Sequence, residues 1–498
     1  MLCFFVLLIS NHSHMKTFLS VLLLGYSLCA QDGASRVASE ALKPSTLESN
    51  LRMLTDQIGG RVPGTPAMEK AVQWGVAGFK AAGADSVTVE QFTISNSWAE
   101  GNTRMSVTAP ESFEVRAVSA AWAPTLEAKR HLPMVDVGEG KPEEFAKAGD
   151  ISGALLVVHS SEMHKWEDLF AEYENAPGTI ERAVKGGAIA IAFQSTRPHD
   201  LLYRHTNALA GEIDRVPMVL IAREDAARIF RLLASGEKLY ADLEIPNRIG
   251  GRFESANVVA ELKGSERPDE YVVLGAHLDS WELGTGALDN GCNAALVIDA
   301  LRAIKASGLK PKRSIRFILF SGEEEGMIGS RAYVTTHRAE MDKIAAVLVV
   351  DSGSGRITGF ATGGRKDVQA AAARLMGPVK QVDSQVRLTT GAESGTDHLD
   401  FFFEGVPTLV ADQEEANYLI NYHAESDTFD KVDMPQLRKH VAETAALVFA
   451  LADSPARVGP RIHRAEIERD MRETHLDEDL KATGIWREWE NGMRGRQD

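Results

Sequence analysis

The chain has 498 residues, of which 44% are apolar and 25% are charged, and its formal net charge is −16 at pH 7. This length exceeds that of one ordinary domain, so we expect two or more. The acidic balance argues against binding to nucleic acid and provides no basic patch for an anionic membrane, but it does not identify a substrate.

The first 30 residues have the composition of a secretory signal. Met15 is followed by a lysine and the apolar run 18–24, and cleavage is expected after Ala30. We interpret residues 1–30 as a signal peptide, with Met15 as an alternative start, and expect an exported protein, either secreted or periplasmic. A lipid anchor at Cys29 is the weaker alternative because Leu28 is large for that signal. No later apolar run reaches about 18 residues, so no transmembrane segment is expected.

The next two segments differ in pattern. In residues 31–130, Thr65 and Pro66 begin a helix, and residues 87–92 alternate as in a strand, which indicates the first part of a larger α/β domain. Residues 131–246 contain short apolar runs separated by helical segments, and none of these runs ends in a metal-ligand pattern. We interpret them as an inserted domain. Its polar cluster at 199–205 is interpreted as an ordinary loop, with a lid or a loop that faces the substrate as the alternative.

Residues 247–455 alternate buried strands with helices. The strands are predicted at 271–274, 315–320, 345–350 and 406–411, and the helices at 291–306, 367–376 and 435–452. This pattern is typical of an α/β fold with a mixed, mostly parallel sheet that is covered on both faces. Functional groups are then expected beyond the carboxyl ends of the strands. The charged tail at 456–498 has weak helical spacing, which predicts a surface helix or a partly disordered segment.

Side chains suited to metal binding follow these strands. His277 ends the first run, Asp289 lies twelve residues later in a glycine-rich loop, Glu324 and Asp351 follow the next two runs, and His423 lies beyond the last. Zinc prefers histidine and carboxylate ligands, and a two-metal hydrolase needs ligands for each ion plus a group that bridges them. The sequence therefore predicts a pair of metal ions at this edge of the sheet.

One assignment provides each ion with three protein ligands. The first ion is held by His277, Asp351 and a bridging Asp289. The second is held by Glu324, His423 and the same bridging aspartate. Three carboxylates and one bridging hydroxide would neutralise two divalent cations, which makes the site less costly to bury than bare charges. Two Zn²⁺ ions are the expected cofactors, and Co²⁺ or Mn²⁺ could substitute for them.

Acidic residues beside the ligands are expected to assist the reaction. Glu323 precedes a ligand glutamate at a strand end, and successive side chains of extended backbone point in opposite directions. We therefore predict that Glu323 is the free general base, which takes the proton of the attacking water and delivers it to the leaving amine. The Asp279 side chain is expected to accept the other ring N–H of His277. Asp427 is expected to support the loop around His423 in a similar way.

The motifs resemble those of a known enzyme family. They are GAHLDSW at 275–281, GALDNG at 286–291, GEEEG at 322–326, VDSG at 350–353 and YHAESDT at 422–428. As a set they are similar to the co-catalytic zinc exopeptidases of metallopeptidase family 28 and, within that family, to the plasma glutamate carboxypeptidase branch. The resemblance covers about residues 45–450. It implies a zinc-exopeptidase sheet with an inserted protease-associated domain at 131–246.

The resemblance also implies roles for single residues. The zinc assignment is the same, and the family pattern Glu-Glu-x-Gly, read back from Gly326, selects Glu323 as the base within the triple acid. Tyr422 resembles a tyrosine that stabilises the oxyanion in some members, with packing as an equal alternative. The family further implies a cis peptide bond after Asp289. The motif GTDH at 395–398 implies supporting or substrate-side groups near the active site, namely Asp397 and His398.

These observations predict an exported dizinc exopeptidase that acts on peptides or dipeptides. Whether it removes amino-terminal residues, removes carboxyl-terminal residues or splits only dipeptides stays open. The alternatives are a single-zinc acyltransferase such as the glutaminyl cyclases and a catalytically inactive receptor-like homologue, and the intact ligand set argues against both. The carboxypeptidase branch tends to form dimers, which makes a homodimer one option, although the sequence shows no interface.

Overall fold

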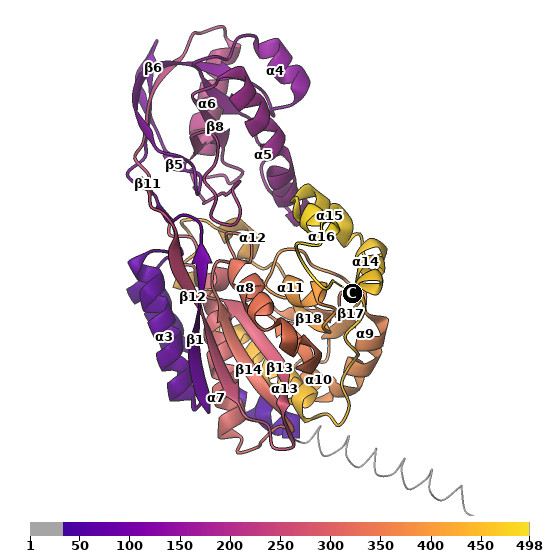
Figure 1. The fold of residues 1–498 in the computed structure, drawn as a ribbon. Coiled ribbons are helices and arrows are strands. Elements are labelled where there is room, and N and C mark those ends of the chain that lie inside the picture. Colours follow the sequence, from indigo (N-terminus) through magenta and orange to yellow (C-terminus); the bar gives the residue numbers. More distant parts are fainter. Residues whose placement is uncertain (1–32, 498) are drawn as a thin grey trace, which may run out of the picture.

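The structure is a computed structural model that describes residues 33–497. The predicted signal peptide at 1–30 lies outside the described residues. Two eight-stranded sheets with helices on their faces form the framework of the molecule (Figure 1). Among the described residues, no helix combines the length and apolar character needed to cross a membrane.

The first sheet carries the strands that were predicted for residues 247–455. Its order is β1-β12-β14-β13-β15-β18-β16-β17. The strands are β1 (Ser86–Ile94), β12 (Phe253–Leu262), β13 (Arg267–His277), β14 (Arg313–Phe320), β15 (Ile344–Val349), β16 (Ile357–Ala361), β17 (Arg387–Thr389) and β18 (Thr408–Gln413). The central neighbours β14, β13, β15 and β18 run parallel, whereas β1, β12 and β16 form antiparallel pairs. The predicted mixed α/β class is confirmed.

The register of the parallel strands brings their carboxyl ends together. His277 at the end of β13 lies opposite Phe320 of β14, and Gly275 lies opposite Val349 of β15. Because the three strands are parallel, the residues that follow them leave the sheet at the same edge. This edge is where the sequence predicted the functional groups.

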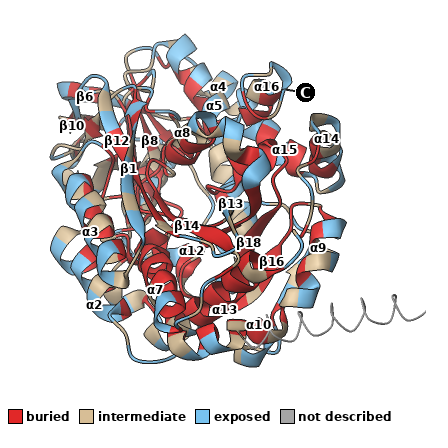
Figure 2. Cartoon of the chain, turned by 60° about the horizontal axis from the view of Figure 1, so that its bottom comes forward, coloured by how far each residue is buried: buried red, intermediate tan, exposed pale blue. Residues whose placement is uncertain are grey.

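Helices cover both faces of the first sheet. On one face lie α3 (Pro66–Ala82), α7 (Cys292–Ala306) and α13 (Met434–Asp453), which share the main core with the strands. On the other face lie α8 (Ile328–Thr336) and α11 (Leu399–Phe403). Buried residues are concentrated in the central strands and in α7 and α13 (Figure 2). Shorter helices nearby are α2 (Leu47–Arg52), α9 (Lys366–Ala372), α10 (Gly377–Val382) and α12 (Tyr418–Asn421).

The second sheet is built mainly from the region that was predicted as an insertion. Its order is β4-β3-β10-β6-β7-β8-β9-β5. The strands are β3 (Arg104–Ala109), β4 (Phe113–Val115), β5 (Ala117–Ser119), β6 (Leu126–Asp136), β7 (Leu155–Val158), β8 (Ala190–Gln194), β9 (Met218–Ile221) and β10 (Tyr240–Ile245). The helices α4 (Pro142–Ala148), α5 (Trp166–Gly186) and α6 (Arg223–Ala234) pack with this sheet (Figure 1).

The second sheet corrects the predicted boundary at residue 131. Strands β3 and β5 pair with β10 and β9, so residues 104–119 belong to this sheet and not to the first. These strands are short, and nothing in their local pattern shows which sheet they join. A two-stranded ribbon of β2 (Trp98–Ala99) and β11 (Arg248–Ile249) lies where the chain enters and leaves this unit.

The charged tail is more ordered than the sequence predicted. It forms α14 (Arg464–Glu473), α15 (Leu476–Ala482) and α16 (Ile485–Glu490). Trp486 and Trp489 are buried in a small core with Phe402 and Phe403 of α11. The surface-helix alternative is confirmed, with three helices in place of one. Partial disorder is not seen in the described residues, because the few apolar residues of this charged segment converge on one apolar patch.

Candidate metal centre

The five predicted ligands meet at the carboxyl edge of the first sheet. His277 ends β13, Glu324 lies in the turn after β14, and Asp351 lies two residues beyond β15. Asp289 lies in the segment Ala287–Gly291 before α7, and His423 follows α12. All five side chains are at most 11% exposed.

The ligand atoms form two groups that share one aspartate. The Nε2 atom of His277 lies 2.9 Å from Asp351 Oδ1 and 3.2 Å from Asp289 Oδ1. The Nε2 atom of His423 lies 2.8 Å from Glu324 Oε2 and 3.4 Å from Asp289 Oδ2. Tetrahedral bonds of about 2.0–2.1 Å to zinc place neighbouring ligand atoms about 3.3 Å apart. Asp289 thus directs one oxygen to each group, as a bridging ligand would.

The donor set fits a pair of cations. The oxygens Asp289 Oδ2, Glu324 Oε1 and Asp351 Oδ1 are buried and accept no hydrogen bond from the described residues. Burial raises the pKa of Glu323 and of Glu324 well above the usual value, and neighbouring carboxylates raise both further. Buried, crowded carboxylates are costly unless a cation or a proton neutralises them. Two divalent ions would supply that charge.

Glu323 lies beside the ligands without belonging to either group of closest contacts. Its Oε2 atom is 4.0 Å from His277 Nε2, farther than the atoms of Asp351 and Asp289. Ligand atoms of Glu323, His277 and Asp351 nevertheless all lie within 4.8 Å of one another. We favour the closer contacts as ligands, and they leave the Glu323 carboxylate free at the wall of the adjoining cavity.

The atom that orients His277 differs from the predicted one. Its Nδ1 atom lies 3.1 Å from the backbone carbonyl oxygen of Asp279 and 3.7 Å from the Asp279 carboxylate. The carboxylate instead accepts the backbone N–H of Glu324 at 3.3 Å. Asp279 therefore contacts both halves of the centre, through its main chain on one side and its side chain on the other.

Asp427 contacts the predicted loop around His423 only through its main chain, which donates to the carbonyl of Ala424 at 3.0 Å. The Asp427 carboxylate accepts the backbone N–H groups of Ala287, Leu288 and Asp289 at 2.7–3.1 Å, so it holds the bridging segment. The Nδ1 atom of His423 lies 3.2 Å from the carbonyl oxygen of Arg204, whose own N–H donates to the carbonyl of His423 at 2.8 Å.

Arg204 was missed because it was read as part of an ordinary polar loop. The loop instead pairs with the segment around His423, since Tyr203 and Ala424 also form a β-bridge. The Arg204 guanidinium is fully buried and donates to Glu100 at 2.6 Å and to Glu282 at 2.5 Å. The polar cluster at 199–205 was the only sign of this contact in the sequence.

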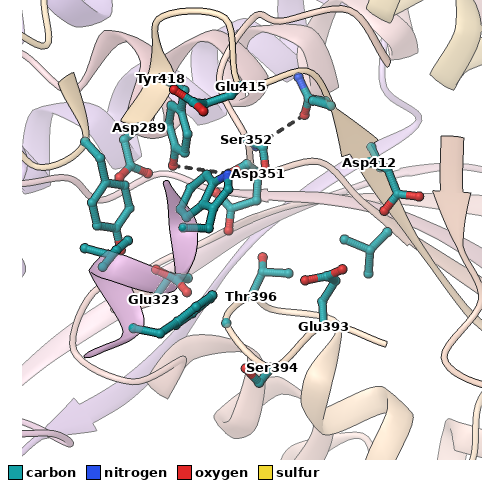
Figure 3. Close-up of a pocket in the computed structure, with 18 of the residues that line it drawn as sticks. Asp289, Glu323, Asp351, Ser352, Glu393, Ser394, Thr396, Asp412, Glu415 and Tyr418 are labelled. Atoms are coloured by element: carbon teal, nitrogen blue, oxygen red, sulfur yellow. Dashed lines mark hydrogen bonds between the residues drawn. The ribbon is translucent and has the colours of Figure 1, made fainter. Parts of the chain in front are cut away.

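A cavity of about 430 Å³ opens onto the centre (Figure 3). The aromatic residues Trp166, Phe170 and Tyr173 of α5 form one wall. Because α5 packs with the second sheet, the unit built on that sheet (the second unit) contributes to the cavity. Tyr422 also lines it and stacks on His423, with ring centroids 3.6 Å apart. A second cavity of about 400 Å³ adjoins the same centre and extends to α15 and α16.

One peptide bond and two further residues implied by the resemblance can be located. The peptide bond between Asp289 and Asn290 is cis, as the resemblance implied. Asp397 and His398 are buried, with 0% and 2% exposure, and line neither cavity. Their burial favours a supporting position over a substrate-side one.

The mixed α/β sheet and its cluster of histidines and carboxylates are those of a metal-dependent hydrolase. Comparison with known families narrows this class. Residues 257–448 match the model of Peptidase family M28. The match includes all five predicted ligands and Glu323, and it excludes the second sheet.

Relatives extend the similarity beyond those residues. Mouse carboxypeptidase Q is 28% identical over 406 residues, which span 81% of this chain and 85% of the relative. Aminopeptidase YwaD of Bacillus subtilis is 27% identical over 57% of this chain and 56% of its own. These names include a carboxypeptidase and an aminopeptidase. The prediction of an enzyme of the metallo-exopeptidase class is confirmed, but the end of the peptide that is attacked stays open.

Solved structures agree with the fold. The crystal structure of a Peptidase M28 precursor from Shewanella amazonensis has a TM-score of 0.78 and 26% identity, and it covers 88% of this chain and all of its own. An aminopeptidase from Aneurinibacillus has a TM-score of 0.63 at 22% identity, over 86% of this chain and 98% of its own. The second likeness concerns the fold alone.

Proposed function

We propose that the protein is an exported exopeptidase that uses two zinc ions to hydrolyse a terminal peptide bond of peptides or dipeptides. The position of Asp289 carries this proposal, because its two oxygens face two separate histidine–carboxylate pairs. A single-zinc acyltransferase would not need such a bridge, and an inactive homologue would not need to keep Glu323. Export is supported only by the composition of residues 1–30.

The ligands divide between the two ions as the contacts suggest. His277 and Asp351 would hold one ion, Glu324 and His423 the other, and Asp289 both. When bound, the ions would supply Lewis-acid chemistry and make a water molecule easier to deprotonate. Co²⁺ or Mn²⁺ would suit the same donors.

The other steps fall to the side chains of this chain. Glu323 takes the proton of the attacking water and returns it to the leaving amine, a role supported by its free carboxylate at the cavity wall. Tyr422 faces the same cavity and would donate a hydrogen bond from its hydroxyl group to the developing oxyanion. The carbonyl of Asp279 fixes the tautomer of His277, and that of Arg204 fixes the tautomer of His423.

Two parts of the prediction extend beyond the site. We propose that the second sheet, from about residue 104 to residue 246, is an inserted domain of the protease-associated type; its position between the segments of the first sheet supports this. A homodimer stays a prediction.

Two adjacent substitutions test the mechanism. Glu323→Gln should keep two bound metal equivalents and lose about 10²–10⁴-fold in kcat. Glu324→Gln, the matched control, should lose metal as well as activity. Retained hydrolysis by Glu323→Gln would exclude Glu323 as the base.

Dipeptides blocked at either end show which terminus the enzyme needs free. Cleavage of only the amino-blocked dipeptides would define a carboxypeptidase.

A further inference from the structure

The cavity beside the metal centre carries negative charge that the proposed mechanism does not use. Apart from the residues already assigned, it is lined by four carboxylates and by no lysine or arginine. One of the four, Glu414, is paired with Arg356 at 2.7 Å. Among the described residues, no salt bridge reaches the other three, Glu393, Asp412 and Glu415.

Glu393 and Asp412 lie near each other at one end of this cavity. Glu393 is exposed and Asp412 is half-buried, so both carboxylates are open to a ligand; partial desolvation, and then the charge of Asp412, raise the pKa of Glu393 to about 7. Figure 3 shows the pair at the end of the cavity away from Asp289, with Thr396 between Glu393 and Asp351. Two neighbouring carboxylates without a cation repel each other, so a positively charged group would be bound favourably there.

The cavity has the other features of a ligand site. Glu324 also lines it, and the Oε1 atom of this glutamate accepts no hydrogen bond although its side chain is only 3% exposed. Because Glu324 and the acidic pair line the same cavity, its charged end is continuous with the reaction centre. Phe170 on the aromatic wall is 51% exposed, so its ring is accessible to a ligand in the cavity. A side chain with an aliphatic stem and a cationic head suits a cavity with apolar and acidic walls.

The second cavity provides no competing site for an anion. It is lined by apolar residues such as Leu209, Met327 and Ile485, and by two arginines. Arg331 is paired with Glu488 at 3.0 Å, and Arg494 is paired with Asp400 at 2.7 Å. In the described part of the chain, neither cavity therefore presents an unpaired arginine or lysine to an acidic substrate.

We propose that Glu393 and Asp412 form a subsite for a basic side chain, so that the enzyme prefers peptides with lysine or arginine next to the scissile bond. This inference rests on the proposed function, because it assigns the substrate class of the same centre. A free α-amino group lies only two bonds from the scissile carbonyl. It would therefore stay beside the metal ligands, whereas a long side chain reaches past Thr396 to the acidic pair.

Dipeptides that differ only in one residue test the subsite. Lysine, norleucine and glutamate are placed in turn at each end of an alanine dipeptide, since norleucine keeps the stem of lysine without its charge. At one of the two ends, the wild-type enzyme should show a kcat/KM at least about tenfold higher for lysine than for norleucine, and lowest for glutamate. Equal values for lysine and norleucine at both ends would overturn the proposal.

Two isosteric variants and one control assign the effect to the acidic pair. Glu393→Gln and Asp412→Asn should reduce the lysine-to-norleucine ratio towards one, with two bound metal equivalents retained. Glu414→Gln should keep the ratio, since this glutamate is paired with Arg356. An unchanged ratio in both isosteric variants would refute the subsite. Equal losses for lysine and norleucine would indicate recognition of the α-ammonium group instead, and would also refute it.

Binding separates a failure of the subsite from a failure of the proposed function. Calorimetry on metal-loaded Glu323→Gln should show the lysine dipeptide binding at least about tenfold more tightly than the norleucine one. This difference in affinity is expected even if the wild-type enzyme hydrolyses no dipeptide. The absence of hydrolysis would count against the proposed exopeptidase activity but not against the subsite. Equal affinities would overturn the subsite while leaving the metal centre untouched.

Discussion

Replacing Arg204 by methionine tests whether the unit built on the second sheet stabilises the metal centre. The guanidinium is fully buried and donates to Glu100, Glu282 and the carbonyl of Ser119. Glu282 lies five residues beyond His277, and the main chain of Arg204 contacts His423. One residue of the second unit therefore contacts segments from both halves of the centre.

The expected cost follows from the burial of these partners. Removing one member of a buried ion pair costs about 3–5 kcal/mol, because the other member stays buried without a counter-charge. Glu100 is 13% exposed, but Glu282 is 32% exposed and regains part of its hydration. We therefore expect a loss near 3 kcal/mol in the free energy of unfolding.

Metal binding should weaken unevenly in the same variant. The main-chain contacts to His423 remain after the substitution, but the loop that makes them loses its anchor. Loss of such support typically costs 10–100-fold in metal affinity. We expect that loss at the ion held by His423 and a smaller one at the ion held by His277.

Denaturant titration and stepwise metal titration check both values. Arg130→Met is the matched control: its pair with Asp242 spans 2.7 Å, but Arg130 is 74% exposed, so its loss should change the free energy of unfolding far less than the loss of Arg204 does. Arg204→Lys keeps the charge and provides a second measurement if the methionine variant does not fold. Wild-type stability together with wild-type affinity for both ions in Arg204→Met would refute the bracing role.

Three further predictions concern stability. Burial raises the pKa of Glu443 on α13 to about 8 from an ordinary 4.5, so the folded state loses stability as pH rises between these values. Glu443→Gln should thus change Tm little near pH 4 and raise the free energy of unfolding by up to about 4 kcal/mol above pH 8. Parallel curves of Tm against pH for the wild type and the variant would contradict this. Chelation should lower Tm, because Asp289, Glu324 and Asp351 are left crowded, and two equivalents of zinc should restore it; an unchanged Tm would argue against metal binding. Trp489→Ala should cost about 3–5 kcal/mol locally and expose the C-terminal helices to proteolysis, whereas wild-type resistance would show that these helices do not depend on it.

Local patterns were sufficient to predict the central strands and the side chains at their ends. An apolar run of strand length marks a buried strand, and the rule that parallel strands end at one edge brings His277, Glu324 and Asp351 together without knowledge of any tertiary contact. Asp289, in the glycine-rich loop twelve residues after His277, was proposed as the bridge because two ions need a shared ligand. Each of these inferences depends on residues that are near each other in the sequence.

Only the tertiary structure decided which distant segments meet. Residues 104–119 pair with the second sheet. The carbonyl of Arg204 contacts His423, which is 219 positions away in the sequence. Trp486 and Trp489 of the charged tail pack on an apolar patch. The carbonyl of Asp279, and not its carboxylate, became the nearer partner of His277. Such contacts depend on the packing of the whole chain, and main-chain atoms, which every residue carries, leave no mark in the sequence.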